Sequence, residues 1–373
     1  MRRRRKFNLD DFQINSVNRR YWRSTNNSLF SWSLLIGLLF ISYCGRNQAN
    51  QWNAPTVKSN ETGMSLSQLY SLEPNLQKCQ EGILNNSEAE KVLDRLNYIR
   101  KLHHLNPVTY NYINDTYTAK AALILAANAD REGTPNSTFR CWSYLEKIDK
   151  QDSLGYQIHY SHSSSIQTTP AINLYKSENF VDALLMDSRR EGLLASSVLL
   201  NPFVKSISFG RVDDKSLVNK AVGLGWDAED LERQVDYISG ADIKFTYNEK
   251  PGINNLKIDT VAYPLGEYPK ELFKKDAYQR GYPTMFFSIV AAQKKLVDRQ
   301  DVDFSNAVVE IHGEDGTNLE ITSMQSIKHQ TRLPNALSWK ANQTKVGLKY
   351  TVKIKNIRVV NKMYTYDYWF KLK

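Results

Sequence analysis

Two histidines three residues apart, His159 and His162, have a spacing that can suit a metal ion. On a helix both imidazoles would lie on one face, and neutral imidazole nitrogens are ligands that zinc accepts. The stretch around them is polar and has no helical period, which is typical of a loop with solvated side chains. The loop interpretation is favoured, and a ligand role for the pair stays open.

Three cysteines are the other reactive side chains of this sequence. Cys44 closes an apolar run, and Cys79 and Cys141 are the cysteines that follow it. Two cysteines in an exported domain are candidates for a disulfide, and the alternative is a pair of buried free thiols. Whether Cys79 and Cys141 form a disulfide therefore depends on whether this part of the chain lies in an oxidising compartment.

The N-terminal part of the chain has the pattern of an exported, membrane-attached protein. Residues 29–44 form a run of sixteen residues without a charge, close behind clustered arginines. This pattern predicts a membrane anchor or signal segment, with residues 1–28 as a basic cytoplasmic segment. Residues 45–78 are polar and predict a tether. Either an uncleaved anchor or a lipidated Cys44 would hold residues 45–373 outside the cytoplasm.

The net charge of +10 does not indicate nucleic-acid binding. Residues 1–28 alone contain eight Lys or Arg and two Asp, and the remaining excess is spread over the rest of the chain. A nucleic-acid-binding protein would show a clustered basic face on a matching fold. We therefore expect no nucleic-acid partner, and the membrane is the partner predicted for residues 29–44.

After the tether, segments whose apolar residues have helical spacing come first along the chain, and segments with strand-like patterns come later. Apolar residues at helical spacing predict a helix over 87–102, opened by a capping box of Ser87 and Glu90. Further helices are predicted at 119–127, 180–187 and 193–200. Strands are predicted at 204–212, 218–226, 243–247 and 258–263. This order predicts an α+β chain with a three-layer α-β-α sandwich over residues 79–265.

Several motifs follow one another through the same range. Leu96 and Asn97 are followed by Arg100, His103, Leu105, Pro107, Val108 and Tyr110 in the pattern L-N-x-x-R-x-x-H-x-L-x-P-V-x-Y. An alanine-rich stretch, a loop ending at Cys141, Asp187-Ser188, Leu199-Leu200-Asn201-Pro202 and Phe209-Gly210 come next. These motifs resemble the CAP domain of cysteine-rich secretory, antigen 5 and pathogenesis-related proteins, in the form of its bacterial secreted branch. The resemblance implies the same α-β-α fold and favours a bond between Cys79 and Cys141.

The resemblance also identifies positions where the family's cleft chemistry is missing. Relatives carry two metal-binding histidines, and the matching positions here are Gly133 and Ala195. Neither residue has a ligand atom, so we expect a degenerate site without a metal, a cofactor or a catalytic residue. The polar residues that can line the changed cleft are His159, His162, Glu132 and Glu191.

Residues 266–373 predict a second domain of a different class. Short alternating runs separated by turns, about ten residues apart, predict an antiparallel β-sandwich. Within it, 308–321 predicts a hairpin around the Asp315-Gly316 turn. Tyr364, Tyr366 and Tyr368 share one face at period two, which can be a glycan-stacking strip, although a core-facing strand is favoured.

These patterns favour a binding or structural protein of the cell envelope over an enzyme. The expected ligand is an envelope component, either a glycan or a protein. The alternatives are a hydrolase with a rebuilt cleft site and a glycan- or peptidoglycan-binding module. A clustered His/Glu constellation would favour the hydrolase, and an exposed aromatic surface would favour glycan binding.

Overall fold

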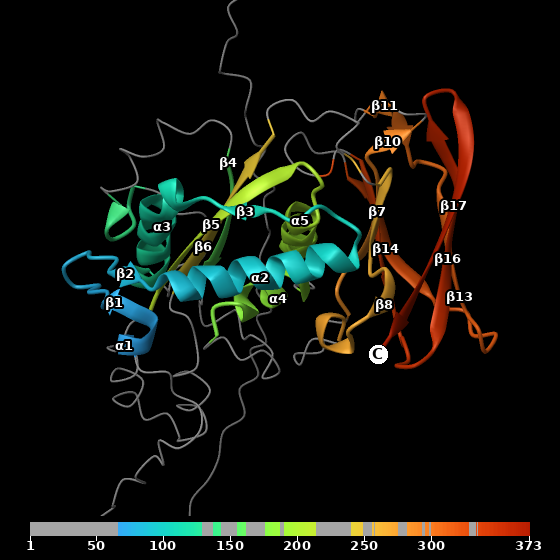
Figure 1. Ribbon diagram of the computed structural model, residues 1–373. Coiled ribbons are helices and arrows are strands. Elements are labelled where there is room, and N and C mark those ends of the chain that lie inside the picture. Colours follow the sequence, from blue (N-terminus) through green and yellow to red (C-terminus); the bar gives the residue numbers. More distant parts are fainter. Residues whose placement is uncertain are drawn as a thin grey trace, which may run out of the picture. The chain divides into compact units, whose positions relative to one another are not determined.

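The computed structural model describes most of the chain behind its N-terminal segments (Figure 1). The described residues are 66–128, 137–142, 155–161, 176–186, 190–213, 240–248, 256, 258–274, 282–292, 295–297, 300–327, 333 and 335–373. All of them belong to one compact unit, Lys58–Lys373. Helices and several sheets occur in this unit, so the chain has the predicted mixed α+β class.

The residues predicted to attach the chain to the membrane are not among those that the structure describes. The cytoplasmic segment, residues 29–44 with Cys44, and most of the tether lie outside the described residues. Within the described ranges, no helix is long and apolar enough to cross a membrane.

The chain enters the unit through helix α1 (Leu66–Leu69) and the strand pair β1 (Tyr70–Leu72) and β2 (Ile83–Leu84). The long helix α2 (Asn86–Leu102) follows and confirms the predicted first helix. Asn85 is its N-cap residue and makes no side-chain cap hydrogen bond. The predicted capping box at Ser87 is therefore wrong, because the helix begins one residue earlier and the Glu88 amide donates to the Asn85 carbonyl.

The first sheet has the strand order β3-β5-β6-β4. Its strands are β3 (Thr109–Tyr110), β4 (Gly155–Ser161), β5 (Val204–Val212) and β6 (Gly240–Tyr247). β5 confirms the strand predicted at 204–212, and the range 218–226 lies outside the described residues. The favoured loop around residue 159 is wrong, because His159 lies on β4, opposite Asp242 of β6.

Helix α3 (Asp115–Ala127) packs directly on one face of this sheet, joined to β3 by the short 3-10 helix η2 (Tyr112–Asn114). Two glycines allow the close approach. A Cβ atom on Gly210 would lie within 3.0 Å of the Thr118 carbonyl group, and one on Gly240 would meet the Ala122 carbonyl oxygen just as closely. The helix is therefore seated on two strands at positions where no side chain fits.

The other helices contribute to a second apolar cluster. Helices α4 (Asn179–Met186) and α5 (Arg190–Leu199) contact each other, and α2 contacts α4 and β5. Ile207 and Phe209, which alternate with the α3-facing Gly210 along β5, are buried in this cluster. Successive residues of a strand point to opposite faces, so each face of β5 packs against a different set of helices.

Two further sheets form the C-terminal part. One has the order β14-β15-β9-β7, and the other has β12-β16-β17-β8 with β13 beside β16. The strands of the first are β7 (Thr260–Tyr263), β9 (Met285–Ile289), β14 (Ile321–Ile327) and β15 (Ala336–Ala341). Those of the second are β8 (Gly266–Tyr268), β12 (Val302–Asp303), β13 (Val308–Gly313), β16 (Lys349–Val359) and β17 (Lys362–Leu372). A small ladder joins β10 (Ala291–Ala292) to β11 (Lys295–Leu296), and η5 is a 3-10 helix at Lys270–Leu272.

One sequence expectation about these strands is confirmed over a shorter range, and another is wrong. The hairpin predicted at 308–321 forms around its turn, where the Gly313 amide donates to the Thr317 carbonyl, the Leu319 amide donates to the Ile311 carbonyl, and His312 and Asn318 form an antiparallel bridge. The longer ladders go elsewhere, because β13 pairs with β16 and β14 pairs with β15. The strand at 258–263 was expected in the first sheet, whereas β7 pairs with β9. One sheet pair, β17 with β8, is parallel rather than antiparallel.

The core continues from the helical part into the C-terminal sheets. One buried cluster contains Leu96 of α2, Phe209 of β5 and Trp339 of β15. The predicted boundary near residue 265 therefore separates two sheet systems that share apolar packing.

His104 has a backbone conformation that favours glycine. It is the second residue after α2, next to the C-cap residue His103, and has a φ of 58°, in the left-handed region. A side chain in this region costs roughly 1–2 kcal/mol. We expect His104→Gly to raise the free energy of unfolding by about 0.5–1 kcal/mol, measured by urea denaturation. His104→Ala, which keeps the Cβ atom, should bring no such gain; an equal gain would mean that the imidazole, not the backbone, is unfavourable.

Candidate functional site

Of the two positions that match the family's ligand histidines, the structure describes one, Ala195. Ala195 lies on α5, is 5% exposed and belongs to the apolar core. Gly133, with its neighbour Glu132, lies outside the described residues. Across the ranges that the structure describes, no group of three or more His, Cys, Asp or Glu side chains is close enough to hold a metal ion.

The structure places only some of the other candidate cleft residues. His159 is on β4 and Glu191 is in α5, and their side chains are not among those described. His162 directly follows β4, outside the described residues. The strand register sets the backbone of His159 opposite that of the buried Asp242.

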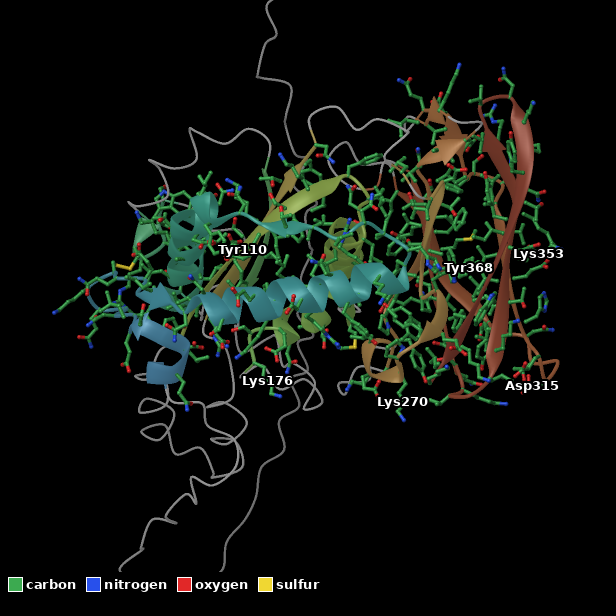
Figure 2. All side chains as sticks on the ribbon, viewed as in Figure 1. Tyr110, Lys176, Lys270, Asp315, Lys353 and Tyr368 are labelled. Atoms are coloured by element: carbon green, nitrogen blue, oxygen red, sulfur yellow. A yellow bond between two sulfur atoms is a disulfide. The ribbon has the colours of Figure 1, made fainter. Side chains whose placement is uncertain are left out.

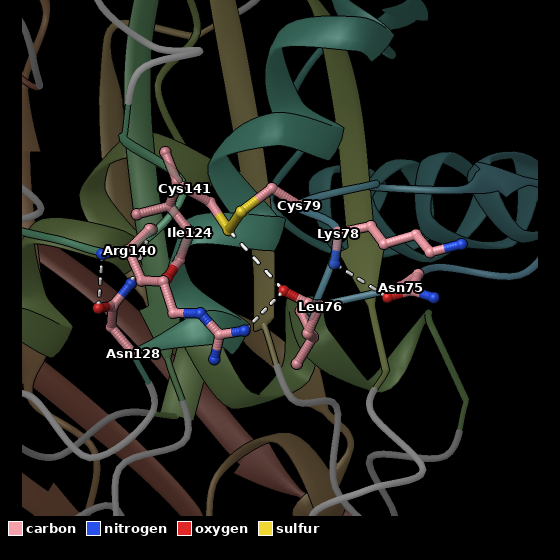
Figure 3. Close-up of a disulfide and its surroundings, with 8 residues drawn as sticks. All are labelled: Asn75, Leu76, Lys78, Cys79, Ile124, Asn128, Arg140 and Cys141. Atoms are coloured by element: carbon pink, nitrogen blue, oxygen red, sulfur yellow. Dashed lines mark hydrogen bonds between the residues drawn. A yellow bond between two sulfur atoms is a disulfide. The ribbon is translucent and has the colours of Figure 1, made fainter.

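The predicted bond between Cys79 and Cys141 is confirmed (Figure 3). It joins the turn after β1 to the segment 137–142, and Cys141 lies in a buried cluster with Leu76. The Leu76 carbonyl oxygen accepts a hydrogen bond from Arg140 Nη2 at 3.1 Å, and Asn128 Oδ1 accepts from the Arg140 amide at 2.9 Å. The disulfide thus fastens the N-terminal strand pair to the segment after α3.

The motif residues of the first helix bind backbone rather than a ligand. Asn97 donates to the Val108 carbonyl and accepts from the Val108 amide, at 3.0 and 2.8 Å. Arg100 is completely buried and donates to three carbonyl oxygens, those of Asn106, Leu199 and Asn201, each at 2.9 Å. Burial lowers the pKa of Arg100 to about 10. The two motif blocks around residues 100 and 200 are thus joined directly.

Tyr110, at the end of the first motif, joins β3 to β5 and α3. Its hydroxyl group accepts from the Phe209 amide at 3.0 Å and lies 2.8 Å from Asp115 Oδ1, to which it donates. Burial raises the pKa of the Asp115 carboxyl to about 6, while the hydrogen bond from Tyr110 opposes the shift. This contact is also part of the scaffold, because it fixes the start of α3 against the sheet.

A buried polar network lies at the far end of β5. It connects β1, β5, the turn before α4 and the start of α2, and its members are Tyr70, Asp213, Arg211, Ser177, Glu88 and Lys91. Tyr70 Oη donates to Asp213 at 2.6 Å, and the Arg211 guanidinium pairs with the same carboxylate at 2.8 Å. Helix α3 also ends here. Val212 pairs with Gly240, and Gly240 packs closely against Ala126, near the end of α3.

The second half of the network runs from Arg211 to the surface. Arg211 Nη1 donates to Ser177 Oγ at 3.0 Å, and Ser177 donates to Glu88 Oε2 at 2.6 Å. Lys91 Nζ completes the chain at 2.5 Å from Glu88 Oε1. Its charges balance, with two cations and two carboxylates.

The network's electrostatics favour a structural role. Burial alone would lower the pKa of Arg211, but the charge of Asp213 raises it above its usual value, so the guanidinium stays charged. Burial and the charge of Asp213 raise the pKa of Tyr70, so its hydroxyl stays protonated. Ser177 is completely buried, and Glu88 and Arg211 are nearly so. A buried network whose members bond to one another holds elements in place and presents no exposed nucleophile.

Sequence reasoning missed this network because its members are far apart along the chain. Tyr70 and Asp213 are separated by 143 positions, and Glu88 and Ser177 by 89. No local spacing rule relates residues at such separations. The one available signal was the charged pair Arg211 and Asp213, directly at the end of an apolar strand.

A scan against protein-family models finds no match to the chain, and a search of curated proteins finds none either.

His103, the histidine of the first motif, connects α2 to the C-terminal sheets. Its ring is 1% exposed, with Nδ1 at 2.8 Å from the Ala262 carbonyl oxygen and Nε2 at 3.1 Å from the Tyr268 hydroxyl. Because the carbonyl can only accept, Nδ1 carries the proton and Nε2 accepts from Tyr268. Burial lowers the pKa of His103 to about 3, with smaller contributions in the same direction from His104 and Arg100.

The buried neutral ring makes stability depend on pH. Below pH 6.5 the unfolded chain protonates His103 while the folded chain does not until about pH 3, so acid favours unfolding. As the pH falls from 6.5 to about 3, we expect His103 to lower the free energy of unfolding by roughly 1.4 kcal/mol for each pH unit. His103→Gln should remove this slope, measured as the difference between two urea-denaturation series. The exposed neighbour provides the control, since His104→Gln should leave the slope in place; an unchanged slope in the His103 variant would refute the assignment.

Proposed function

We propose that this protein is an exported, membrane-tethered binding or structural protein of the cell envelope, built on a CAP-like domain with a degenerate metal site. The observation that carries the proposal is the contrast between scaffold and cleft. The motif residues Asn97, Arg100 and Tyr110 make scaffold contacts, while the second ligand position is a buried methyl group at Ala195.

We propose further that residues 79–265 form a three-layer α-β-α sandwich and that the C-terminal sheets form a β-sandwich. The first is supported by the packing of α3 on one face of β5 and of the α2 cluster on the other. The second is supported by the ring contact between Phe287 of β9 and Tyr366 of β17, 5.1 Å apart. The CAP assignment rests on the order of the motifs and on the bonds between them.

Tethering is proposed from the sequence of the N-terminal segment. An apolar run behind clustered arginines favours an extracytoplasmic location for the folded unit. The Cys79–Cys141 disulfide supports this location, because disulfides persist in oxidising compartments.

Binding is favoured over hydrolysis by the chemistry of the described residues. The buried serine–carboxylate contact, Ser177 with Glu88, is closed to solvent and shared with Arg211. A nucleophile that a substrate cannot reach does not support catalysis. Of the described contacts, none favours the hydrolase alternative.

The test is co-sedimentation of the detergent-solubilised full-length protein with isolated envelope fractions, run alongside a release assay for soluble fragments. We expect saturable binding to an envelope fraction without release of fragments. Fragment release that depends on the protein would support the hydrolase instead, and the absence of binding to every fraction would contradict the proposal.

A further inference from the structure

The strands β16 and β17 have one face toward the core and one face toward solvent. Tyr366 and Tyr368 on β17 pack against Phe287 of β9, which confirms that the tyrosine strip faces the core. In Figure 2, Tyr368 lies on the inner side of these strands and Lys353 on the other side. The aromatic residue on the outer side of β17 is Trp369, which is 39% exposed.

Cross-strand register groups six side chains on the outer face. The directly opposite pairs are Lys349 with Lys371, Thr351 with Trp369, and Lys353 with Asp367. We call these six residues the Trp369 platform. Three consecutive pairs on one face of two adjacent strands give a nearly flat surface, with the indole ring between charged pairs on either side.

The platform holds an excess of positive charge that the rest of this face does not have. Lys355 pairs with Glu310 at 2.7 Å and Arg358 with Asp303 at 2.7 Å, so cations farther along the same face are compensated. The platform lysines 349, 353 and 371 form no ion pair with any described residue. Within β16 and β17, the three lysines face one carboxylate, that of Asp367. The flanking strands place Glu310 opposite Lys353 and Glu267 opposite Lys371, but these two carboxylates form ion pairs with Lys355 and Lys373 instead.

The geometry around Trp369 places charge and ring together. Lys349 Nζ lies 4.8 Å from the centroid of the Trp369 ring. Lys349 and Lys371 are directly opposite, and like charges in that arrangement repel each other. An anion bound between them would relieve this repulsion, so the surface is complementary to a negatively charged ligand.

We propose that the Trp369 platform binds an anionic polysaccharide. An acidic group that pairs with Lys349 would draw its ammonium away from the Trp369 ring, so that the apolar face of a sugar ring can stack on the indole. Further acidic groups along the chain can pair with Lys353 and Lys371. Sugar hydroxyl groups can donate to the Asp367 carboxylate. This inference rests on the proposed binding function and assigns it a site and a ligand chemistry.

Asp367 also distinguishes this ligand from a single-stranded nucleic acid, which combines rings with anions as well. A DNA backbone has no hydrogen-bond donor for a carboxylate, whereas a polyhydroxylated chain supplies donors. The platform also has one exposed aromatic ring, while nucleic-acid surfaces stack successive bases on several rings.

The test is affinity electrophoresis of the full-length protein in non-ionic detergent, with alginate, a polyuronate, embedded in the native gel. We expect retardation by alginate that weakens as salt is raised, and little retardation by the neutral glucan pullulan. Trp369→Ala should weaken alginate binding about tenfold, with Trp369→Phe restoring part of it. The double variant Lys349→Gln with Lys371→Gln should weaken binding and reduce its salt dependence.

Lys345→Gln with Arg358→Gln is the matched control, because it removes the same charge outside the platform, from ion pairs with Asp315 and Asp303, and should bind alginate as the unmodified protein does. Equal loss in the control and platform variants, equal binding of pullulan, or tighter binding of oligothymidylate than of alginate would overturn the proposal. Binding to an envelope fraction that the platform variants leave unchanged would overturn it as well, while leaving the proposed binding function in place. Failure of the unmodified protein to bind any fraction would contradict the binding function itself.

Discussion

Replacing Gly210 with alanine is expected to destabilise the protein by about 3 kcal/mol or more. The added Cβ atom would lie within 3.0 Å of the Thr118 carbonyl group and of the Ala119 amide nitrogen, which are backbone atoms of α3. Backbone cannot rotate away as a flexible side chain can, so the helix would have to move off the sheet. Urea denaturation of Gly210→Ala and the unmodified protein measures the loss.

A second glycine provides the control for this prediction. Gly316 lies in the turn after β13, and a Cβ atom there meets nothing within 4 Å. Its φ of 83° means that Gly316→Ala should cost only the left-handed backbone penalty, roughly 1 kcal/mol. Equal losses in the two variants would show that α3 does not rest on β5 at Gly210.

Arg100→Met is expected to be the second large effect, a loss of about 2–4 kcal/mol. Methionine can fill the space of the arginine stem, but it cannot donate to the carbonyl groups of Asn106, Leu199 and Asn201. Removing a buried charge returns part of the loss, since burial already disfavours the charged guanidinium. The cost of leaving these three carbonyl groups without a donor is larger than this gain, because they lie inside the protein, away from water.

Lys101→Met is the comparison for Arg100→Met, because Lys101 is the exposed neighbour on the same helix. Its loss should stay within about 0.5 kcal/mol. If thermal or urea unfolding gave the two variants the same stability, Arg100 would not be the connection between the two motif blocks.

Local patterns in the sequence were sufficient for the helices and for several strands. The period of apolar residues placed α2, and the nearly continuous apolar run placed α3 as a buried helix. β5 matched its predicted range because its pattern is bounded by Pro202 and by charged residues after Val212. These features depend on neighbours along the chain, which the sequence displays directly.

Partner choice among strands could not be predicted in the same way. β13 precedes and β14 follows a turn that forms a short hairpin, yet the full length of β13 pairs with β16, and β14 pairs with β15. The pairing is decided by which sheet buries each strand's apolar side, and this depends on residues far away in sequence. The same reason conceals the network from Tyr70 to Lys91 and the platform around Trp369.

The candidate site was predictable only through the resemblance. The substitutions at Gly133 and Ala195 are visible once the motifs are aligned, and the burial of Ala195 adds that an imidazole there would have to displace core atoms. The burial of His103 and the left-handed backbone at His104 required the structure.

The most direct test of the central claim, a CAP-like scaffold without metal chemistry, is isothermal titration of zinc into the full-length protein. We expect no stoichiometric binding, because one of the two proposed ligand positions is a glycine and the other is a buried alanine. His159→Ala and His162→Ala should then give the same baseline as the unmodified protein. One equivalent of tightly bound zinc that either substitution abolishes would mean that the metal site has moved rather than disappeared, and the hydrolase interpretation would replace the one proposed.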